Sequence, residues 1–371
     1  MKLFKSLLVA PATLGLLAPM TATANELNLK DVSGYSSSEE VQNISEFNPA
    51  EELAVTNSRV DGLEARFNNF EAGGFSETTV ASFSVDAVLG ATDGSATSET
   101  TSLDYQFNIG LSTSFTGEDS LDIAIDSGNS TPSVVSGAFG FDSGTTLNVD
   151  GVTYSFPVGG ATMVVGDATD ISTTFTGACV YSAFTDYTPD DCGTGNSLGV
   201  GGSAVTASIG YAFDSGFSLA GGVSSPENEI LGDAADIYGL NAAYSADNYG
   251  VAVAYVTDDG GANAETTTWG LQGYYTFDLA SISVGYETQE SGGTDSDGYF
   301  VGLTFPEVGP GSVNVAAATT GLIAETADET MVYEASYSYP VNDSMTITPG
   351  VFIVEDTTDD TGVAVKASFS F

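Results

Sequence analysis

Residues 363–371 read Val-Ala-Val-Lys-Ala-Ser-Phe-Ser-Phe, with apolar residues at every second position. Val363, Val365, Ala367, Phe369 and Phe371 share one face of an extended chain, because successive side chains of a strand point to opposite sides. A strand that meets lipid on one face and water on the other alternates in this way. The stretch therefore predicts the closing strand of a transmembrane antiparallel β-barrel, with Phe371 as its membrane-insertion signal.

The same period of two runs back through most of the chain and predicts an all-β fold. Sixteen strands follow from it, near 79–90, 101–115, 119–127, 146–156, 161–169, 203–213, 216–224, 235–244, 249–257, 265–277, 281–289, 297–305, 312–320, 329–339, 344–354 and 361–371. An even number brings both ends of a bacterial barrel to one side. The register of 128–146 is uncertain and could add two strands, so fourteen to eighteen strands stay open. A soluble β-sandwich also alternates and is the other alternative.

The connections between these strands alternate in length. Tight links such as 214–216 and 278–280 alternate with longer polar links such as 225–234 and 290–296. Aromatic residues gather where the strands meet the tight links. Short turns on one side, long loops on the other and aromatic girdles are typical of outer-membrane barrels. The pattern therefore favours the membrane barrel over the sandwich.

The N-terminal part of the chain has a different composition. Residues 1–24 carry Lys2 and Lys5, then a short apolar stretch, then Ala22-Thr23-Ala24, which is typical of a cleavable secretory signal. Residues 25–75 form a second segment, and 76–371 form the barrel. In the second segment apolar residues recur at heptad spacing, at Leu53, Val60, Leu63, Phe67 and Phe70. They predict a short periplasmic helix that joins three chains as a coiled coil, with a lone helix or a linker as the alternative.

The longest connection, 170–202, follows the fifth strand and contains both cysteines of the chain. Such a long loop usually has a function, and the lumen of a wide barrel is water-filled unless something narrows it. We expect this loop to fold inward as a pore constriction; a surface loop is the alternative. Cys179 and Cys192 should form a disulfide in an oxidising compartment. The candidate acids at the constriction are Asp170, Asp186, Asp190 and Asp191.

Charge is the main chemical feature of the barrel region. The chain has 50 acidic and 6 basic residues, and Lys366 is the only basic residue in 76–371. Acids at polar strand positions predict a lumen that prefers cations. Adaptation of every surface to salt water is the alternative explanation, and the negative charge argues against nucleic acid as a partner. The candidate pore-lining residues are Asp86, Asp104, Asp122, Glu287, Glu334 and Lys366.

The chain contains no histidine. This excludes a Ser-His-Asp triad, a Cys-His pair and an ordinary zinc site. Acidic clusters such as 295–298 do not form a full calcium-binding loop, and we interpret them as solvated surface. The sequence therefore predicts no enzyme activity, no catalytic residue, no metal site and no cofactor.

Short segments at both ends of the chain resemble a known family. These are residues 1–12, Glu26-Leu27-Asn28, the Val-Asp-Gly-Leu-Glu-Ala-Arg element at 60–66, the turn at 154–159 and residues 347–352. They resemble cyanobacterial major outer-membrane porins of the carbohydrate-selective, OprB-type family. Family members usually carry an S-layer-homology domain, understood to grip cell-wall polymer, before the 60–66 element. Only about thirty residues occupy that interval here, too few for such a domain, so the resemblance does not extend to cell-wall binding.

The residues and the resemblance together imply a porin in the bacterial outer membrane. It would be a homotrimer, surrounded by lipid, that lets small hydrophilic solutes and ions diffuse passively. The resemblance adds carbohydrates to these solutes, although the region offers only Trp269 as a large stacking ring. The alternative function is a structural envelope barrel or surface protein without significant transport.

Overall fold

The computed structural model describes residues 79–94, 100–129, 134–141, 143–188, 190–200, 204–227, 230, 232, 235–261, 264–355 and 360–371. The chain divides into two units, Met1–Glu77 and Thr78–Phe371, and the description below concerns the second. The predicted signal peptide lies outside the described residues. So does the predicted periplasmic helix with Leu53, Val60, Leu63, Phe67 and Phe70.

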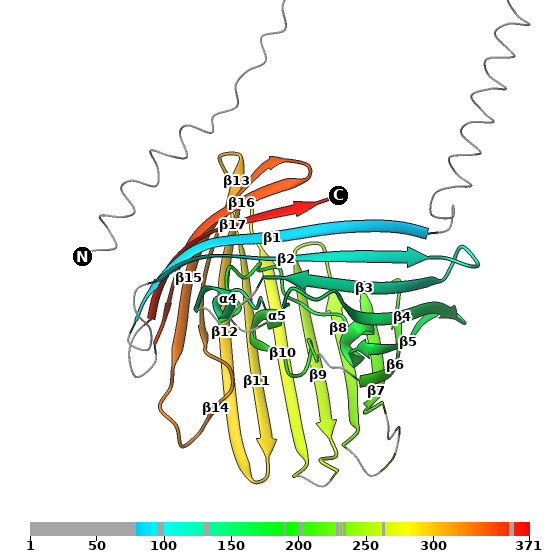
Figure 1. Ribbon diagram of the computed structural model, residues 1–371. Coiled ribbons are helices and arrows are strands. Elements are labelled where there is room, and N and C mark those ends of the chain that lie inside the picture. Colours follow the sequence, from blue (N-terminus) through cyan, green and yellow to red (C-terminus); the bar gives the residue numbers. More distant parts are fainter. Residues whose placement is uncertain are drawn as a thin grey trace, which may run out of the picture. The chain divides into compact units, whose positions relative to one another are not determined.

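The described chain forms one antiparallel sheet that closes on itself, because β1 pairs with both β2 and β17. The β14 segment has only two residues and pairs beside β12, so sixteen strands make the barrel (Figure 1). The strands are β1 (Thr79–Asp93), β2 (Thr100–Thr113), β3 (Ser120–Gly128), β4 (Asn148–Val158), β5 (Ala161–Thr169), β6 (Ala204–Ala212), β7 (Phe217–Ser225), β8 (Ile237–Ser245), β9 (Tyr249–Asp258), β10 (Thr266–Thr276), β11 (Ser281–Ser291), β12 (Thr294–Val308), β13 (Gly311–Thr319), β14 (Ile323–Ala324), β15 (Met331–Asn342), β16 (Met345–Val354) and β17 (Asp360–Ser370).

The predicted fold class is confirmed: a closed, antiparallel barrel of sixteen strands. The possible extra strands in 128–146 are absent from the described part of that segment, where α4 (Val134–Ala138) is a short helix. The long polar link expected at 290–296 is wrong. Gly292 and Gly293 have φ values of 60° and 81°, so they close a tight two-residue turn between longer strands β11 and β12.

The two faces of the wall differ as the alternation predicts. Along β10, Trp269 and Leu271 are exposed on the outer face, whereas Thr268 and Gln272 are buried on the inner face. Leu240 and Leu103 are likewise 64% and 61% exposed on the outside. A soluble sandwich would turn such residues into a core between two sheets, and the closed barrel presents them outward instead.

Aromatic pairs lie near both rims of the barrel. At the short-turn rim the rings of Tyr211 and Phe213 are 4.6 Å apart, and those of Phe217 and Tyr244 are 4.7 Å apart. Near the long-loop rim, Tyr255 and Trp269 pair across β9 and β10 at 4.7 Å. Rings at these two levels match the interfacial girdles of membrane barrels.

Asp119 organises the short turn between β2 and β3. Its carboxylate accepts hydrogen bonds from the Tyr154 hydroxyl at 2.7 Å and from the Thr116 and Phe115 amides at 2.8 and 2.9 Å. These bonds, that from Tyr154 first, hold the pKa of Asp119 well below its usual value. Their stabilising contribution is therefore complete above the ordinary carboxyl pKa and is lost as the pH falls through the lowered value.

Three short helical segments lie on the inside of the barrel: α4 and α5 (Asp190–Gly193), which Figure 1 labels, and η3 (Ile171–Thr174). α4 packs on β1 and β2, η3 on β5 to β8, and α5 on β11 and β12. Among the described residues, no helix is long and apolar enough to cross a membrane.

Candidate functional site: an inward loop in the barrel

The connection between β5 and β6 lies inside the barrel. Ile171 is completely buried over Gly222 and Gly239 of the inner wall, and Ala178 packs on the inward alanines of β8 and β9. Phe184 is 2% exposed and Leu198 is 6% exposed. We call residues 170–200 the inward loop. It covers the inner face of the wall from β6 to β16 in two passes.

The first pass of the inward loop, 176–185, leads away from β5 across the strands, and we call it the outward pass. Its backbone amides donate hydrogen bonds to polar side chains of the inner wall. Asn241 on β8 accepts from the Thr176 amide at 2.8 Å. Gln272 on β10 accepts from the Ala178 amide at 2.6 Å. Ser283 on β11 accepts from Val180 at 3.1 Å. Because the backbone groups of a buried segment need partners, these side chains fix the path of the loop.

The outward pass ends on Glu334 of β15. This carboxylate is 3% exposed and accepts four hydrogen bonds from the loop. The donors are the Tyr181 hydroxyl at 2.9 Å, the Phe184 amide at 2.8 Å, and the Thr185 amide and hydroxyl at 2.9 and 2.8 Å. Burial and the nearby Glu334 charge raise the pKa of Tyr181, so its phenol stays protonated as a donor.

The return pass, 191–198, lies beside the outward one. The Cys179–Cys192 disulfide joins the two passes with its Cα atoms 5.9 Å apart. The Gln272 amide, which accepts from Ala178, also donates to the Asp191 carbonyl and to the Thr194 hydroxyl. One wall side chain therefore holds both passes next to the disulfide.

Glu287 of β11 holds the end of the return pass. Its side chain is 1% exposed. It accepts from the Ser197 hydroxyl at 2.6 Å and from the Asn196 side-chain amide at 2.8 Å. The Asn196 backbone amide adds a longer bond at 3.3 Å. Glu287 therefore fixes residues 196–197, as Glu334 fixes 181–185.

Glycines of the inner wall let the loop come this close. A Cβ on Gly302 would lie 2.6 Å from the Tyr181 ring, and one on Gly350 would lie 2.5 Å from the Phe184 ring. Real Cβ atoms do not approach other atoms this closely, so a larger residue would push the loop away from the wall. Sequence reasoning missed this role, although both glycines occupy inward positions of their strands.

A second segment, 134–141, meets the inward loop. Val135 and Ala138 of α4 are buried against Val88 and Ala364 of the wall. The Asp186 amide donates to the Ala138 carbonyl at 2.8 Å, so the two segments are bonded directly. Sequence reasoning treated this stretch as possible strands. The spacing of Val134, Val135, Ala138 and Phe139 is helical and could have revealed the segment.

An apolar cluster fills this side of the barrel. Phe139 packs edge-on against Phe184, with ring centroids 5.1 Å apart, and contacts Phe352 of β16 at 6.4 Å. Phe352 is only 2% exposed. The cluster consists of Val88, Val135, Ala138, Phe184, Phe352 and Ala364, with Phe139, Phe141, Tyr187 and Val354 at its edge. The inward loop and α4 are therefore part of one packed interior.

The predicted pore-lining residues do not form one group. Asp86 and Asp122 are half-buried on the inner face and accept from Ser368 at 2.5 Å and from Ser120 at 2.9 Å. Lys366 is half-buried on β17, opposite Val88. Asp104 is 3% exposed and accepts from Ser102. We expected Glu287 and Glu334 in contact with the lumen water, and this was wrong, because the inward loop covers both.

The predicted constriction acids also differ from one another. Asp186 and Asp191 are exposed on the loop. Asp170 precedes η3 and accepts from the Ser172 hydroxyl at 2.6 Å. Asp190 begins α5. At the other end of the chain, the Phe371 backbone pairs with Phe83 of β1 through two hydrogen bonds, and its side chain is 74% exposed.

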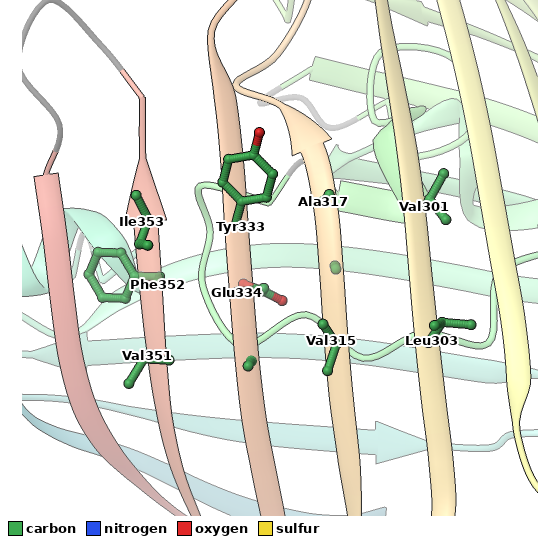
Figure 2. A pocket seen from close by; sticks show the side chains of 11 residues that line it. Val301, Leu303, Val315, Ala317, Tyr333, Glu334, Val351, Phe352 and Ile353 are labelled. Atoms are coloured by element: carbon green, nitrogen blue, oxygen red, sulfur yellow. The ribbon is translucent and has the colours of Figure 1, made fainter.

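A hollow of about 460 Å³ lies on the outer face of β12, β13, β15 and β16. Figure 2 shows outward side chains that line it, such as Val301, Val315 and Ile353. Most of the lining residues belong to the apolar outer belt, and Ala316, Glu334 and Phe352 of the inner face also line the hollow. The described residues include no group of three or more His, Cys, Asp or Glu that could hold a metal ion.

Comparisons with known proteins agree with this architecture. The solved structure of Pseudomonas putida OprB shares 12% identity and a TM-score of 0.64, covering 79% of this chain and 94% of that one. The trimer form of Vibrio cholerae OmpT shares 13% identity and a TM-score of 0.56, covering 80% of this chain and all of that one. A variant of Rhodopseudomonas blastica porin shares 14% identity and a TM-score of 0.52, covering 79% and 100%. The fold is that of an outer-membrane porin.

Sequence comparisons add little to this. No family model matches the chain. An uncharacterized protein of Nostoc sp., alr4550, is 37% identical over 115 residues, which are 30% of this chain and only 18% of that protein. The closed wall and its exposed apolar belt, together with the porin fold, place the barrel in an outer membrane.

Proposed function

We propose that this protein is a porin through which small hydrophilic solutes and ions diffuse passively, with a preference for cations. The observation that carries the proposal is the inward loop, which a disulfide and a row of wall side chains hold inside a closed barrel of porin fold. An element of this kind inside the lumen narrows the passage of a channel. The transport involves no covalent chemistry.

The charges inside the barrel support the preference for cations. Asp186 and Asp191 are exposed on the loop, and Asp86 and Asp122 lie half-buried on the inner wall. Lys366 is the only basic residue of 76–371. Carboxylates favour cations most where the passage is narrow, because salt screens charges in wide water-filled regions.

A reversal potential in a KCl gradient across a planar bilayer tests this proposal. We expect the cation-selective sign, because Asp86, Asp122, Asp186 and Asp191 outnumber Lys366 among the candidate pore residues that are not buried. Replacing Asp86, Asp122 and Asp186 together by Asn should move the reversal potential toward zero. The matched control is Asp343→Asn in the turn between β15 and β16, which should leave it unchanged. An anion-selective wild-type channel would refute the preference, and a protein without conductance would favour a structural role.

The resemblance to OprB-type porins extends the proposal to carbohydrates. The support is the set of sequence segments noted above, together with the similarity in fold to OprB. Swelling of liposomes that contain the protein, measured with neutral sugars of increasing size, tests it. Swelling with the smallest sugars supports their passage, whereas swelling with none limits the channel to ions.

We also propose that the protein forms trimers through residues 25–75. The support is the heptad spacing of Leu53, Val60, Leu63, Phe67 and Phe70 and the trimer form of the structurally similar OmpT. Deleting 48–72 should leave folded, heat-modifiable monomers in the membrane, because the described strands β1 to β17 pair with one another into a closed sheet. Gel mobility without heating measures the result, and trimers that persist unchanged would contradict the coiled-coil proposal.

A further inference from the structure

We infer that Glu287 and Glu334 are positioning residues that set the aperture of the pore by holding the inward loop against the wall. They do not select ions in the passage. This inference rests on the proposed porin function, since an aperture has meaning only for a channel. It concerns two residues whose inward strand positions would suggest that they line the lumen.

Burial separates these two carboxylates from Asp86 and Asp122 of the inner wall. Glu287 and Glu334 are 1% and 3% exposed, whereas Asp122, which also points inward but lies on β3, is half-buried. A buried carboxylate is costly unless hydrogen bonds compensate it, and bonds to a charged acceptor are the strong ones. Each buried carboxylate therefore holds its donors firmly.

The hydrogen-bond donors to Glu287 and Glu334 belong to the inward loop. All the donors described above for Glu334 come from Tyr181, Phe184 and Thr185 of the outward pass. Those of Glu287 come from Asn196 and Ser197 of the return pass. By contrast, Asp122 accepts from Ser120 of its own strand. The two glutamates therefore join the loop to the wall, whereas Asp122 does not.

The anchored points lie at different places along the loop. Glu334 holds the far end of the outward pass, and Glu287 holds the end of the return pass. Between them, Gln272 and the Cys179–Cys192 disulfide connect the passes. Loss of either carboxylate should therefore free one part of the loop while the disulfide keeps the passes together. The freed part would move into the passage and make the current fluctuate.

Chymotrypsin provides a test that does not depend on conductance. Tyr181, Phe184 and Tyr187 lie between the two cysteines, so a cut there leaves a nicked chain that separates only after reduction. The variants are Glu334→Gln, Glu287→Gln and the double variant, in the full-length protein embedded in lipid bilayers. The controls are Asp122→Asn and Glu307→Gln, the latter an exposed acid at the end of β12.

We expect Glu334→Gln to be nicked roughly tenfold faster than the wild type, because the new amide group faces donors and leaves them unpaired. Its reversal potential should stay near the wild-type value while its open-channel current noise rises. Asp122→Asn should shift the reversal potential toward zero and leave the nicking rate and the current noise at wild-type values. Glu307→Gln should change none of these quantities. Glu287→Gln should also speed nicking, and the double variant should be nicked fastest.

Unchanged nicking in the double variant, with a reversal potential shifted as in Asp122→Asn, would overturn the inference. If the glutamine variants fail to give heat-modifiable barrels, Tyr181→Phe combined with Thr185→Val removes two donors and leaves the wall intact. That variant must also be nicked faster, and a wild-type rate would again overturn the inference. A wild-type protein without conductance would refute the porin proposal itself, whereas the nicking rates would still report on the anchors.

Discussion

Replacing residues 171–202 by a short Gly-Ser turn is expected to raise single-channel conductance roughly twofold or more, because the lumen of a wide barrel is water-filled unless something narrows it. The barrel should still close, since Thr169 and Ala204 are partners across β5 and β6 and a short turn can join them. The measurement is the distribution of single-channel conductance steps in a planar bilayer.

Two further changes serve as controls for the replacement of 171–202. Trimming the acidic link 355–360 should barely change conductance, because it is a short connection that joins the ends of β16 and β17. Reducing the Cys179–Cys192 bridge should have a smaller effect than the replacement, because Glu287, Glu334 and Gln272 still hold the loop. Equal and negligible effects from all three changes would show that the passage is narrowed elsewhere.

Phe352→Ala is expected to lower the free energy of unfolding by about 3 kcal/mol or more, within the range measured when a large buried ring is truncated and leaves a cavity. Phe352 is 2% exposed and packs with Phe139 and Tyr187, so its ring joins β16 to both inward segments. Urea-induced unfolding of the barrel in detergent, followed by its heat-modifiable band, measures the change.

The neighbouring residue on the same strand is the matched control. Val351 points outward and is 48% exposed, so Val351→Ala removes few internal contacts. It should cost well under half as much as Phe352→Ala. Equal losses for the two variants would mean that the apolar cluster does not stabilise the barrel interior.

Much of the barrel could be predicted from the sequence because a strand exposes its two faces at a period of two residues. The alternation along β10 or β17 therefore gives both the strand and the side that faces lipid. The predicted strands lie within a few residues of those in the structure. The exception at Gly292 and Gly293 has a local cause, since two positive φ values close a turn that the polar composition of 290–296 hides.

The sequence by itself determined the barrel, the positions of its strands and the outward apolar belt, because these depend on neighbours along the chain. The structure settled the strand number at sixteen, since α4 occupies the segment where two more strands were possible. The tertiary structure alone decided what covers the inner wall. The inward position of Glu334 can be predicted, but its partner Phe184 is 150 positions away in the chain. Ser197 and Glu287 are 90 positions apart. Such contacts arise only once the sheet has closed and its registers are set, and no local pattern of residues encodes them.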